Sequence, residues 1–224
     1  MKTSIYNIRT IVIILFLALF IFVSCQSSKP VINQVFNERE ANNINRIIDF
    51  YDVYILSYYK DSIPIDKAYK QFISYATPIA ENEGDLSLFI PPDSLLIPFI
   101  NSLDKEAMSE ICALSDSVKF YGIDTVLKVP YNFSFRYRSK FVQEYLKKLS
   151  SRNKILNDYY DSFIKAGDIS PVTYYFLMFE YDIINFNDRD ERFAFIAAFF
   201  FRNPISEFQR DLMENRHKCI IKID

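Results

Sequence analysis

Glycine and histidine are scarce in this sequence, and tryptophan is absent. The 224 residues include three glycines, one histidine and no tryptophan. Glycine permits tight turns and close backbone approach to a phosphate, so its scarcity argues against turn-rich all-β folds and against a glycine-rich phosphate loop. The single histidine, His217, leaves little material for a catalytic triad or a histidine-based metal site. Several common enzyme classes are therefore disfavoured.

Aromatic residues, in contrast, are abundant. The chain has 16 Tyr and 22 Phe, which predict a bulky, well-filled core. Lysine and arginine number 26 against 28 aspartates and glutamates, a formal net charge of −2. Domains that bind nucleic acid are typically basic, whereas this balance is mildly acidic, so we expect no nucleic-acid partner.

The first 25 residues have the pattern of a secretory signal. Lys2 and Arg9 are the only charged residues before Cys25, and residues 11–23 are all apolar. A membrane-spanning helix needs about 20 apolar residues. The core of a signal peptide needs only about 7–15, so the length of this run favours a cleaved signal over a permanent span.

The end of the apolar run reads Phe22-Val23-Ser24-Cys25. It resembles the lipobox of bacterial lipoproteins, in which small residues precede an obligatory cysteine. The resemblance implies cleavage before Cys25 and its modification by fatty acids such as palmitate, which would anchor the protein to a membrane of the cell envelope. The residue after the cysteine is Gln26. In many lipoproteins an aspartate at this position retains the protein in the inner membrane, so the outer membrane is the expected location here.

Removal of residues 1–24 leaves 24 basic and 28 acidic residues, a net charge of −4. We expect a tether over residues 25–36 and one domain over residues 37–224. The predicted fold class is mainly α, a single helical domain with a small sheet of two or three strands. A chain of this length can bury a substantial core, and one domain is the default expectation.

Apolar residues at helical spacing predict most of the elements. The first helix is expected to start near Asn37, and a second near Asp66, which Pro78 should bend or end. Asp104 is expected to cap a helix that reaches about Leu114 and buries Cys112. The apolar face of the first helix is formed by Ile44, Ile47, Ile48, Tyr51, Ile55 and Tyr58.

A short sheet and further helices are expected in the second half of the chain. Residues 118–129 are rich in β-branched residues and predict one or two strands, which residues 133–137 could extend and residues 219–223 could pair with. Helices should follow from Ser139 to Gly167 and from Pro171 onward. Asp188 with Glu191 three residues later predicts a capping box at the start of a phenylalanine-rich, largely buried helix.

The candidate chemical groups are few. His217 lies near the end of a predicted helix, where a cation is favourable, so a capping role is the preferred interpretation. A zinc site from Cys112, Cys219 and His217 would need a carboxylate as fourth ligand, and no metal or other cofactor is expected. Cys112 and Cys219 could form a disulfide in the envelope, and their spacing does not decide the question.

Two acidic features have a structural and a functional interpretation. Glu180 has apolar neighbours at helical spacing, so it is a candidate buried carboxylate with a raised pKa, although a structural ion pair is favoured. Residues 185–191 resemble a calcium loop superficially but lack its register and its glycine, which favours a capping linker. We expect no metal there.

Charge is segregated along the chain. Residues 136–154 hold seven basic residues and one acid, Glu144, whereas residues 158–191 hold eight acids and two basic residues. The two segments are expected to face each other or to be solvated. The alternative is a basic surface for anionic lipid headgroups or an acidic partner.

Three functional classes remain open. The favoured one is a non-enzymatic protein-binding module of accessory, inhibitor or immunity type; the others are a carboxylate-based hydrolase of an envelope polymer and a structural envelope component. A hydrolase needs two carboxyls about 5–10 Å apart in a cleft. For a binding module, tyrosines are useful interface anchors. If adjacent tyrosines lie about 100° apart on a helix, one of each pair is exposed. The candidate contacts are Tyr59, Tyr159, Tyr174 and Tyr175.

Overall fold

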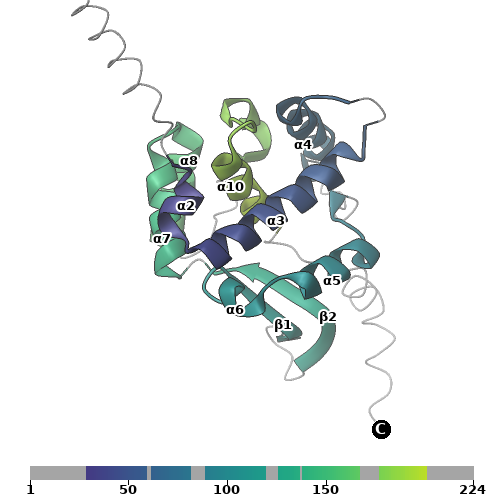
Figure 1. Cartoon of the computed structure of the whole chain (residues 1–224). Helices are drawn as coiled ribbons and strands as arrows, with labels where there is room; N and C mark the ends of the chain where they lie inside the picture. Colours follow the sequence, from purple (N-terminus) through teal and green to yellow (C-terminus); the bar gives the residue numbers. More distant parts are fainter. Residues whose placement is uncertain are drawn as a thin grey trace, which may run out of the picture. The chain divides into compact units, whose positions relative to one another are not determined.

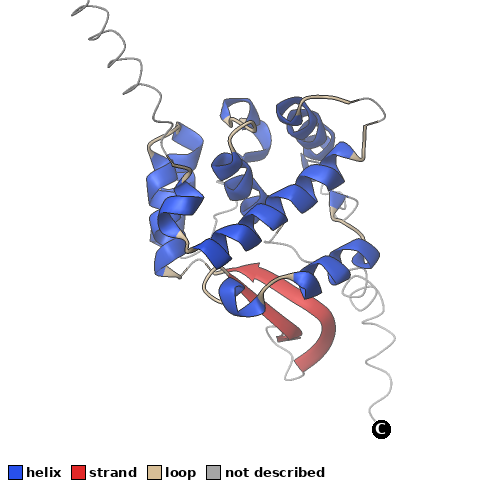
Figure 2. Cartoon of the chain, in the orientation of Figure 1, coloured by secondary structure: helices blue, strands red, loops and turns tan. Residues whose placement is uncertain are grey.

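The computed structural model of the chain describes residues 29–59, 62–81, 89–119, 126–136, 138–166 and 177–200. This part of the chain is mainly helical (Figure 1) and carries one two-stranded antiparallel sheet, which lies on one side of the helices (Figure 2). The expected mainly α fold with a small sheet is confirmed. The elements are α2 (Val31–Val35), α3 (Glu38–Leu56), α4 (Ile65–Glu81), α5 (Asp93–Ser102), α6 (Lys105–Met108), β1 (Cys112–Lys119), β2 (Val126–Phe135), α7 (Lys140–Ser150), α8 (Lys154–Ala166), η2 (Tyr181–Ile183) and α10 (Arg189–Phe199).

Helix α3 begins where the sequence predicts. Asn37 caps it by accepting the backbone N–H of Glu40, and the Glu40 carboxylate accepts the backbone N–H of Asn37 at 2.9 Å. This reciprocal capping box satisfies two N–H groups that a helix start leaves without partners. The buried stripe of α3 is the predicted one as far as Ile55, while Tyr58 lies beyond the end of the helix and is 46% exposed.

Two prolines lie inside helices. Pro78 does not end α4, which continues to Glu81, and α5 runs through Pro98. A proline removes one backbone hydrogen bond from a helix and strains one turn. Near the end of α4 and in α5 this cost is tolerated, since both helices pack apolar side chains into the core.

The helix expected from Asp104 to Leu114 is shorter than predicted. Asp104 caps it by accepting the N–H of Ala107, but α6 ends at Met108 and β1 begins at Cys112. Strand β1 pairs with β2 from Cys112 opposite Phe135 to Lys119 opposite Val126, with an irregularity between Ser115 and Ser117. The sheet therefore starts earlier in the chain than the β-branched residues indicated, although Cys112 is buried as expected.

Helix α10 is the centre of the core. Every residue from Asp190 to Phe199 is buried, as the phenylalanine-rich sequence predicts. Asp188 caps the helix by accepting the N–H groups of Asp190 and Glu191. Rings of α10 meet rings of α4 and α7 edge-on, and Phe200, the residue after the helix, stacks on Tyr51 of α3 with 4.2 Å between centroids. Such pairs stabilise a core beyond the area they bury.

The folded body begins earlier than the expected domain boundary at residue 37. The compact unit starts at Val31, and Val31, Ile32 and Phe36 are all buried. Residues 31–36 therefore belong to the domain, and the expected tether over residues 25–36 is shorter by those six residues. Among the described residues, no helix combines the length and the apolar character that crossing a membrane requires.

Candidate functional site

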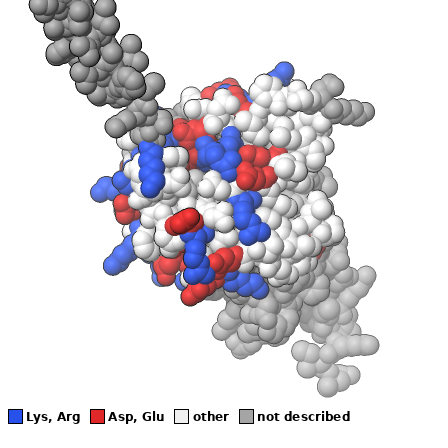
Figure 3. All heavy atoms as spheres, viewed as in Figure 1, with Lys and Arg blue, Asp and Glu red and all other residues white. Residues whose placement is uncertain are grey.

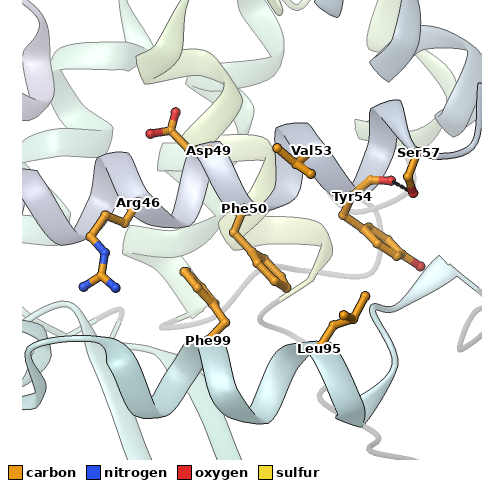
Figure 4. A pocket seen from close by; sticks show the side chains of 8 residues that line it. All are labelled: Arg46, Asp49, Phe50, Val53, Tyr54, Ser57, Leu95 and Phe99. Carbon is orange, nitrogen blue, oxygen red and sulfur yellow. Dashed lines mark hydrogen bonds between the residues drawn. The ribbon is translucent and has the colours of Figure 1, made fainter. Parts of the chain in front are cut away.

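An open apolar groove of about 490 Å³ lies between α3 and α5 (Figure 4). Its size is in the range of ordinary ligand and side-chain pockets. The groove runs along the second half of α3, and the surface over that half of α3 and over α5 shows few charged side chains (Figure 3). It is lined by Arg46, Asp49, Phe50, Val53, Tyr54, Ser57, Leu95 and Phe99.

The two walls of the groove are joined by an aromatic stack at its floor. Phe50 of α3 and Phe99 of α5 lie face to face, with centroids 4.1 Å apart and planes inclined by 7°. Both side chains are half-buried. Because this stack fixes α5 against α3, the groove has a defined floor in the absence of any occupant.

Two aliphatic side chains that line the groove are exposed to solvent. Val53 on α3 is 69% exposed and Leu95 on α5 is 53% exposed, on opposite walls (Figure 4). Single exposed apolar residues are normal on protein surfaces, whereas a grouped apolar surface is typical of a contact site. Both residues line the same groove as the stacked rings of Phe50 and Phe99, so apolar side chains are grouped at this site.

One tyrosine, Tyr54, is among the residues that line the groove (Figure 4). The Tyr54 and Tyr58 hydroxyls are 2.6 Å apart, and the two rings meet edge-on. Burial, and then the hydrogen bond to Tyr58, raise the pKa of Tyr54 well above its ordinary value. Both findings keep the Tyr54 hydroxyl protonated at neutral pH, so it can donate to an incoming carbonyl or carboxylate.

The charged residues at the rim already have partners within the domain. Arg46 donates to the Ser102 carbonyl at 2.9 Å and to the Ser102 hydroxyl at 2.7 Å. Asp49 accepts from Arg189 of α10 at 2.8 Å. These contacts tie α3 to α5 and α10, so the groove offers mainly apolar surface and tyrosine hydroxyls to a ligand.

A second, more polar groove of about 400 Å³ lies along the first turns of α3. It contains one carboxylate, Glu38, and the apolar groove also contains one, Asp49. A carboxylate-based hydrolase needs two in one cleft. Neither of these two grooves in the described part of the chain supplies that pair.

A cluster of carboxylates gathers around Arg152, between α7 and α8. Its guanidinium lies 2.9 Å from Asp188, 2.9 Å from Asp190 and 3.8 Å from Glu191. Burial raises the pKa of Glu191, while the Asn185 N–H and the charge of Arg152 act against this. The expected pairing between the basic and acidic segments is thus confirmed for Arg152. Each of these carboxylates also accepts a hydrogen bond from a backbone N–H, which indicates a structural role.

A second buried network lies behind the groove. Asp52 of α3 accepts the Tyr69 hydroxyl at 2.7 Å and lies 3.4 Å from the Arg192 guanidinium. Burial raises the pKa of Asp52, opposed by the hydrogen bond from Tyr69 and by the charges of Arg192 and Arg189. Arg192 also donates to the Phe186 carbonyl at 2.6 Å. The network fixes α3, α4 and α10 to one another.

The structure corrects two of the four predicted contact residues, Tyr59 and Tyr159. Tyr159 is fully buried, and Tyr160, which the helical pattern placed in the core, is half-buried. Tyr59 is half-buried and donates its hydroxyl to the Ala68 carbonyl at 3.2 Å. Burial raises its pKa to about 12. Tyr174 and Tyr175 lie outside the described residues.

Glu180 is also corrected. It was a candidate for a buried carboxylate, but the structure leaves it exposed at the start of η2. The backbone leaves the α-helical conformation there, with φ −107° and ψ 24°, so the helical spacing that predicted apolar neighbours does not apply. Ile183, one of those neighbours, is itself 48% exposed.

Several further predictions concern residues beyond the described ranges. His217, Cys219 and the acylation site Cys25 are among them, so the capping role of His217 and the anchor stay predictions. Cys112 is a free, buried cysteine whose pKa burial raises well above its ordinary value. A disulfide between Cys112 and Cys219 stays a prediction, since Cys219 lies outside the described residues.

The groove residues Val53 and Leu95 were missed at the level of sequence. The sequence does contain a signal for the exposure of Val53, because this residue lies outside the apolar stripe that predicts the buried face of α3. Leu95 has no such signal, since it opens the apolar run over residues 95–100, in which no polar residue marks the exposed side. Among the described residues, no group of three or more His, Cys, Asp or Glu could hold a metal ion. The chain matches no protein-family model, no curated protein and no solved structure.

Proposed function

We propose that this protein is a lipid-anchored component of the cell envelope, held in the outer membrane through Cys25, whose domain binds an apolar segment of a protein partner in the α3–α5 groove. No chemical step is part of this function. It belongs to the accessory, inhibitor or immunity type of module. The anchor rests on the charged, apolar and Ser24-Cys25 sequence at the start of the chain.

The observation that carries the binding function is the pair Val53 and Leu95. Val53 of α3 is 69% exposed and Leu95 of α5 is 53% exposed, and both line the groove together with the stacked rings of Phe50 and Phe99. Burying exposed aliphatic and aromatic surface is the main driving force of protein association, and pre-ordered anchors lose little entropy on binding.

The chemistry of the groove defines the chemistry of the partner segment. Because Arg46 and Asp49 are engaged within the domain, a charged segment gains little there. A helix or strand with neighbouring Leu, Ile or Phe side chains fits the apolar walls, and its polar backbone or side-chain oxygens can accept from the Tyr54 hydroxyl. A volume of about 490 Å³ holds a few such side chains.

The test uses photo-crosslinking in living cells, with a photoreactive phenylalanine analogue at Val53 or at Leu95 of the full chain. The control position is Ile164 of α8, which is also apolar and 50% exposed. We expect one protein to crosslink to both groove positions and not to the control. That protein is then identified and purified, and its affinity is measured for the full-length chain in detergent.

Charge substitutions in the groove complete the test. Val53→Asp and Leu95→Asp should each weaken binding of the purified partner by about tenfold or more, which corresponds to roughly 1.4 kcal/mol. Ile164→Asp should leave the affinity unchanged. Crosslinks to lipid or to a second copy of this chain alone, or an affinity that ignores the groove substitutions, would contradict the proposal. Turnover of an envelope polymer that survives both substitutions would favour the hydrolase class.

A further inference from the structure

The start of the folded domain is fastened to its core. The Asp190 carboxylate accepts the backbone N–H of Val31 at 2.8 Å and of Ile32 at 2.9 Å, and the side chain of Asp190 is only 2% exposed. Arg152 donates to the same carboxylate at 2.9 Å. The position at which the chain enters the domain is therefore fixed relative to α7, α8 and α10.

The chain before this point is short. Six Cα-to-Cα steps separate Cys25 from Val31. Even fully extended, they span only about 20 Å. An acylated Cys25 would thus keep Val31 within about 20 Å of the lipid headgroups, and the surface around Val31 would be the part of the domain nearest to the membrane.

Basic side chains border this point. The Lys148 ammonium lies 3.5 Å from the Gln34 side-chain oxygen of α2, and Lys147 is exposed beside it in the last turn of α7. Within the described ranges, two basic residues of the 136–154 segment form ion pairs with acids, Arg152 and Lys154. No described carboxylate forms an ion pair with Lys147 or Lys148.

The α3–α5 groove lies away from this end. Helix α3 begins at Glu38, directly after α2, and Val53 follows fifteen residues later, about 22 Å along the helix axis. Figure 1 shows α2 beside α7, and α5 beneath the second half of α3. The chain thus enters the domain through α2, next to the first turn of α3, whereas the groove lies along the second half of α3.

We propose that the end of the domain formed by α2 and the last turn of α7 rests on an anionic lipid surface, with Lys147 and Lys148 against the headgroup phosphates and the groove facing away. This inference rests on the proposed anchor at Cys25. Each exposed lysine next to a lipid anchor adds to the attraction to anionic lipid, and basic residues on one side of the domain orient it as well as hold it.

The experiment measures the depth of two fluorescent labels on the full-length protein in vesicles containing phosphatidylglycerol. A Cys219→Ser background carries one new cysteine, either Gln34→Cys on α2 or Val53→Cys in the groove. Quenching lipids with a headgroup spin label report proximity. We expect strong quenching at Gln34 and little at Val53. The charge-reversed pair Lys147→Glu and Lys148→Glu should reduce the difference, because each lysine adds roughly fivefold to the preference for an anionic surface.

A control pair of substitutions tests whether any charge reversal changes the quenching. The mass of the N-terminal peptide shows whether Cys25 is acylated. The pair Lys67→Glu and Lys105→Glu reverses two exposed charges elsewhere and should leave the quenching pattern unchanged. An unacylated Cys25 would overturn both the anchor and the orientation. An acylated Cys25 with equal or stronger quenching at Val53 would overturn the orientation alone, as would a pattern that does not change when Lys147 and Lys148 are reversed.

Discussion

Asp190 accepts the backbone N–H of Val31 at 2.8 Å across 159 residues of sequence. The contact satisfies one of the N–H groups that the start of α2 leaves open, and a negative charge at that position also suits the helix dipole. Since Arg152 pairs with the same carboxylate, three segments meet at one buried group: the start of the domain, the turn between α7 and α8, and the first turn of α10.

Removing this carboxylate should destabilise the domain strongly. Asp190→Ala leaves two backbone N–H groups without their acceptor and removes one of the carboxylates that pair with Arg152, so we expect a loss of about 3–5 kcal/mol in the free energy of unfolding. Asp190→Asn keeps one acceptor oxygen and should cost less, about 1–3 kcal/mol. Urea unfolding followed by circular dichroism measures both.

Asp158→Ala is the matched control. It removes a carboxylate whose partner, Lys154, has a side chain that is 70% exposed. Pairs of that kind contribute at most about 1 kcal/mol. If Asp190→Ala costs no more than Asp158→Ala, the fastening of α2 to α10 has little energetic weight.

The sequence predicted the elements whose cause is local. The helix starts at Asn37 and Asp188 were predicted because each cap acts within three or four residues, and the burial of α10 followed from its phenylalanines. The bond from Val31 to Asp190 could not be predicted, because nothing local distinguishes Asp190 from the acids around it. The same holds for the groove, which exists only once α5 packs on α3.

The predictions for Tyr59 and Tyr159 failed for a related reason. Tyr159 and Tyr160 both fit a helical stripe, and the packing of α7 on α8 selects Tyr159 for the core. Tyr58 and Tyr59 follow the last residue of α3, Leu56, so the angle between neighbours on a helix does not apply to them. Periodicity identifies a helix well, but it does not fix its end or the exact face that a neighbour covers.

The pKa of Asp52 predicts one component of the pH dependence of stability. Burial raises it above the ordinary value of 3.8, so the folded state binds a proton more tightly than the unfolded chain does. A raised carboxyl pKa makes stability fall as pH rises from the ordinary value through the folded pKa. The groups that face Asp52 are Tyr69, Arg192, Arg189 and Asp49.

Asp52→Asn should remove this component. We therefore expect the wild type to gain stability relative to the variant as pH is lowered toward 3.8. The free energy of unfolding of the wild type minus that of the variant should increase over this range. Urea titrations at several pH values measure the difference. Asp161→Asn, which removes an exposed carboxylate of α8, is the control for a change in net charge. A constant difference across this range would show that Asp52 has no raised pKa in the folded state.

The Cys112 thiol should be protected in the folded protein. It is fully buried at the start of β1, and burial raises its pKa, so little thiolate is available for alkylation. We expect iodoacetamide to modify Cys112 at least about tenfold more slowly than an exposed cysteine introduced by Ile164→Cys, since the thiolate fraction falls tenfold per pKa unit. Peptide mass spectrometry after timed quenching measures the two rates.

The same measurement decides the disulfide. After unfolding in guanidinium without reductant, both Cys112 and Cys219 should be alkylated if they are thiols. Modification that appears only after reduction would show a bridge between them and would remove the basis of the rate prediction.

The anchor is tested by replacing Cys25. The charged start, the apolar run over residues 11–23 and the Ser24-Cys25 pair predict that Cys25 becomes the acylated first residue of the mature protein. Cys25→Ala should leave the precursor uncleaved at this site and unlabelled by radioactive palmitate, since the thiol that receives the lipid is gone. Ser27→Ala, two residues later, is the matched control and should be processed and labelled normally. The anchor would be refuted if the Cys25→Ala precursor were still cleaved before residue 25 and still carried palmitate, and the orientation of the domain on the membrane would then have no basis either.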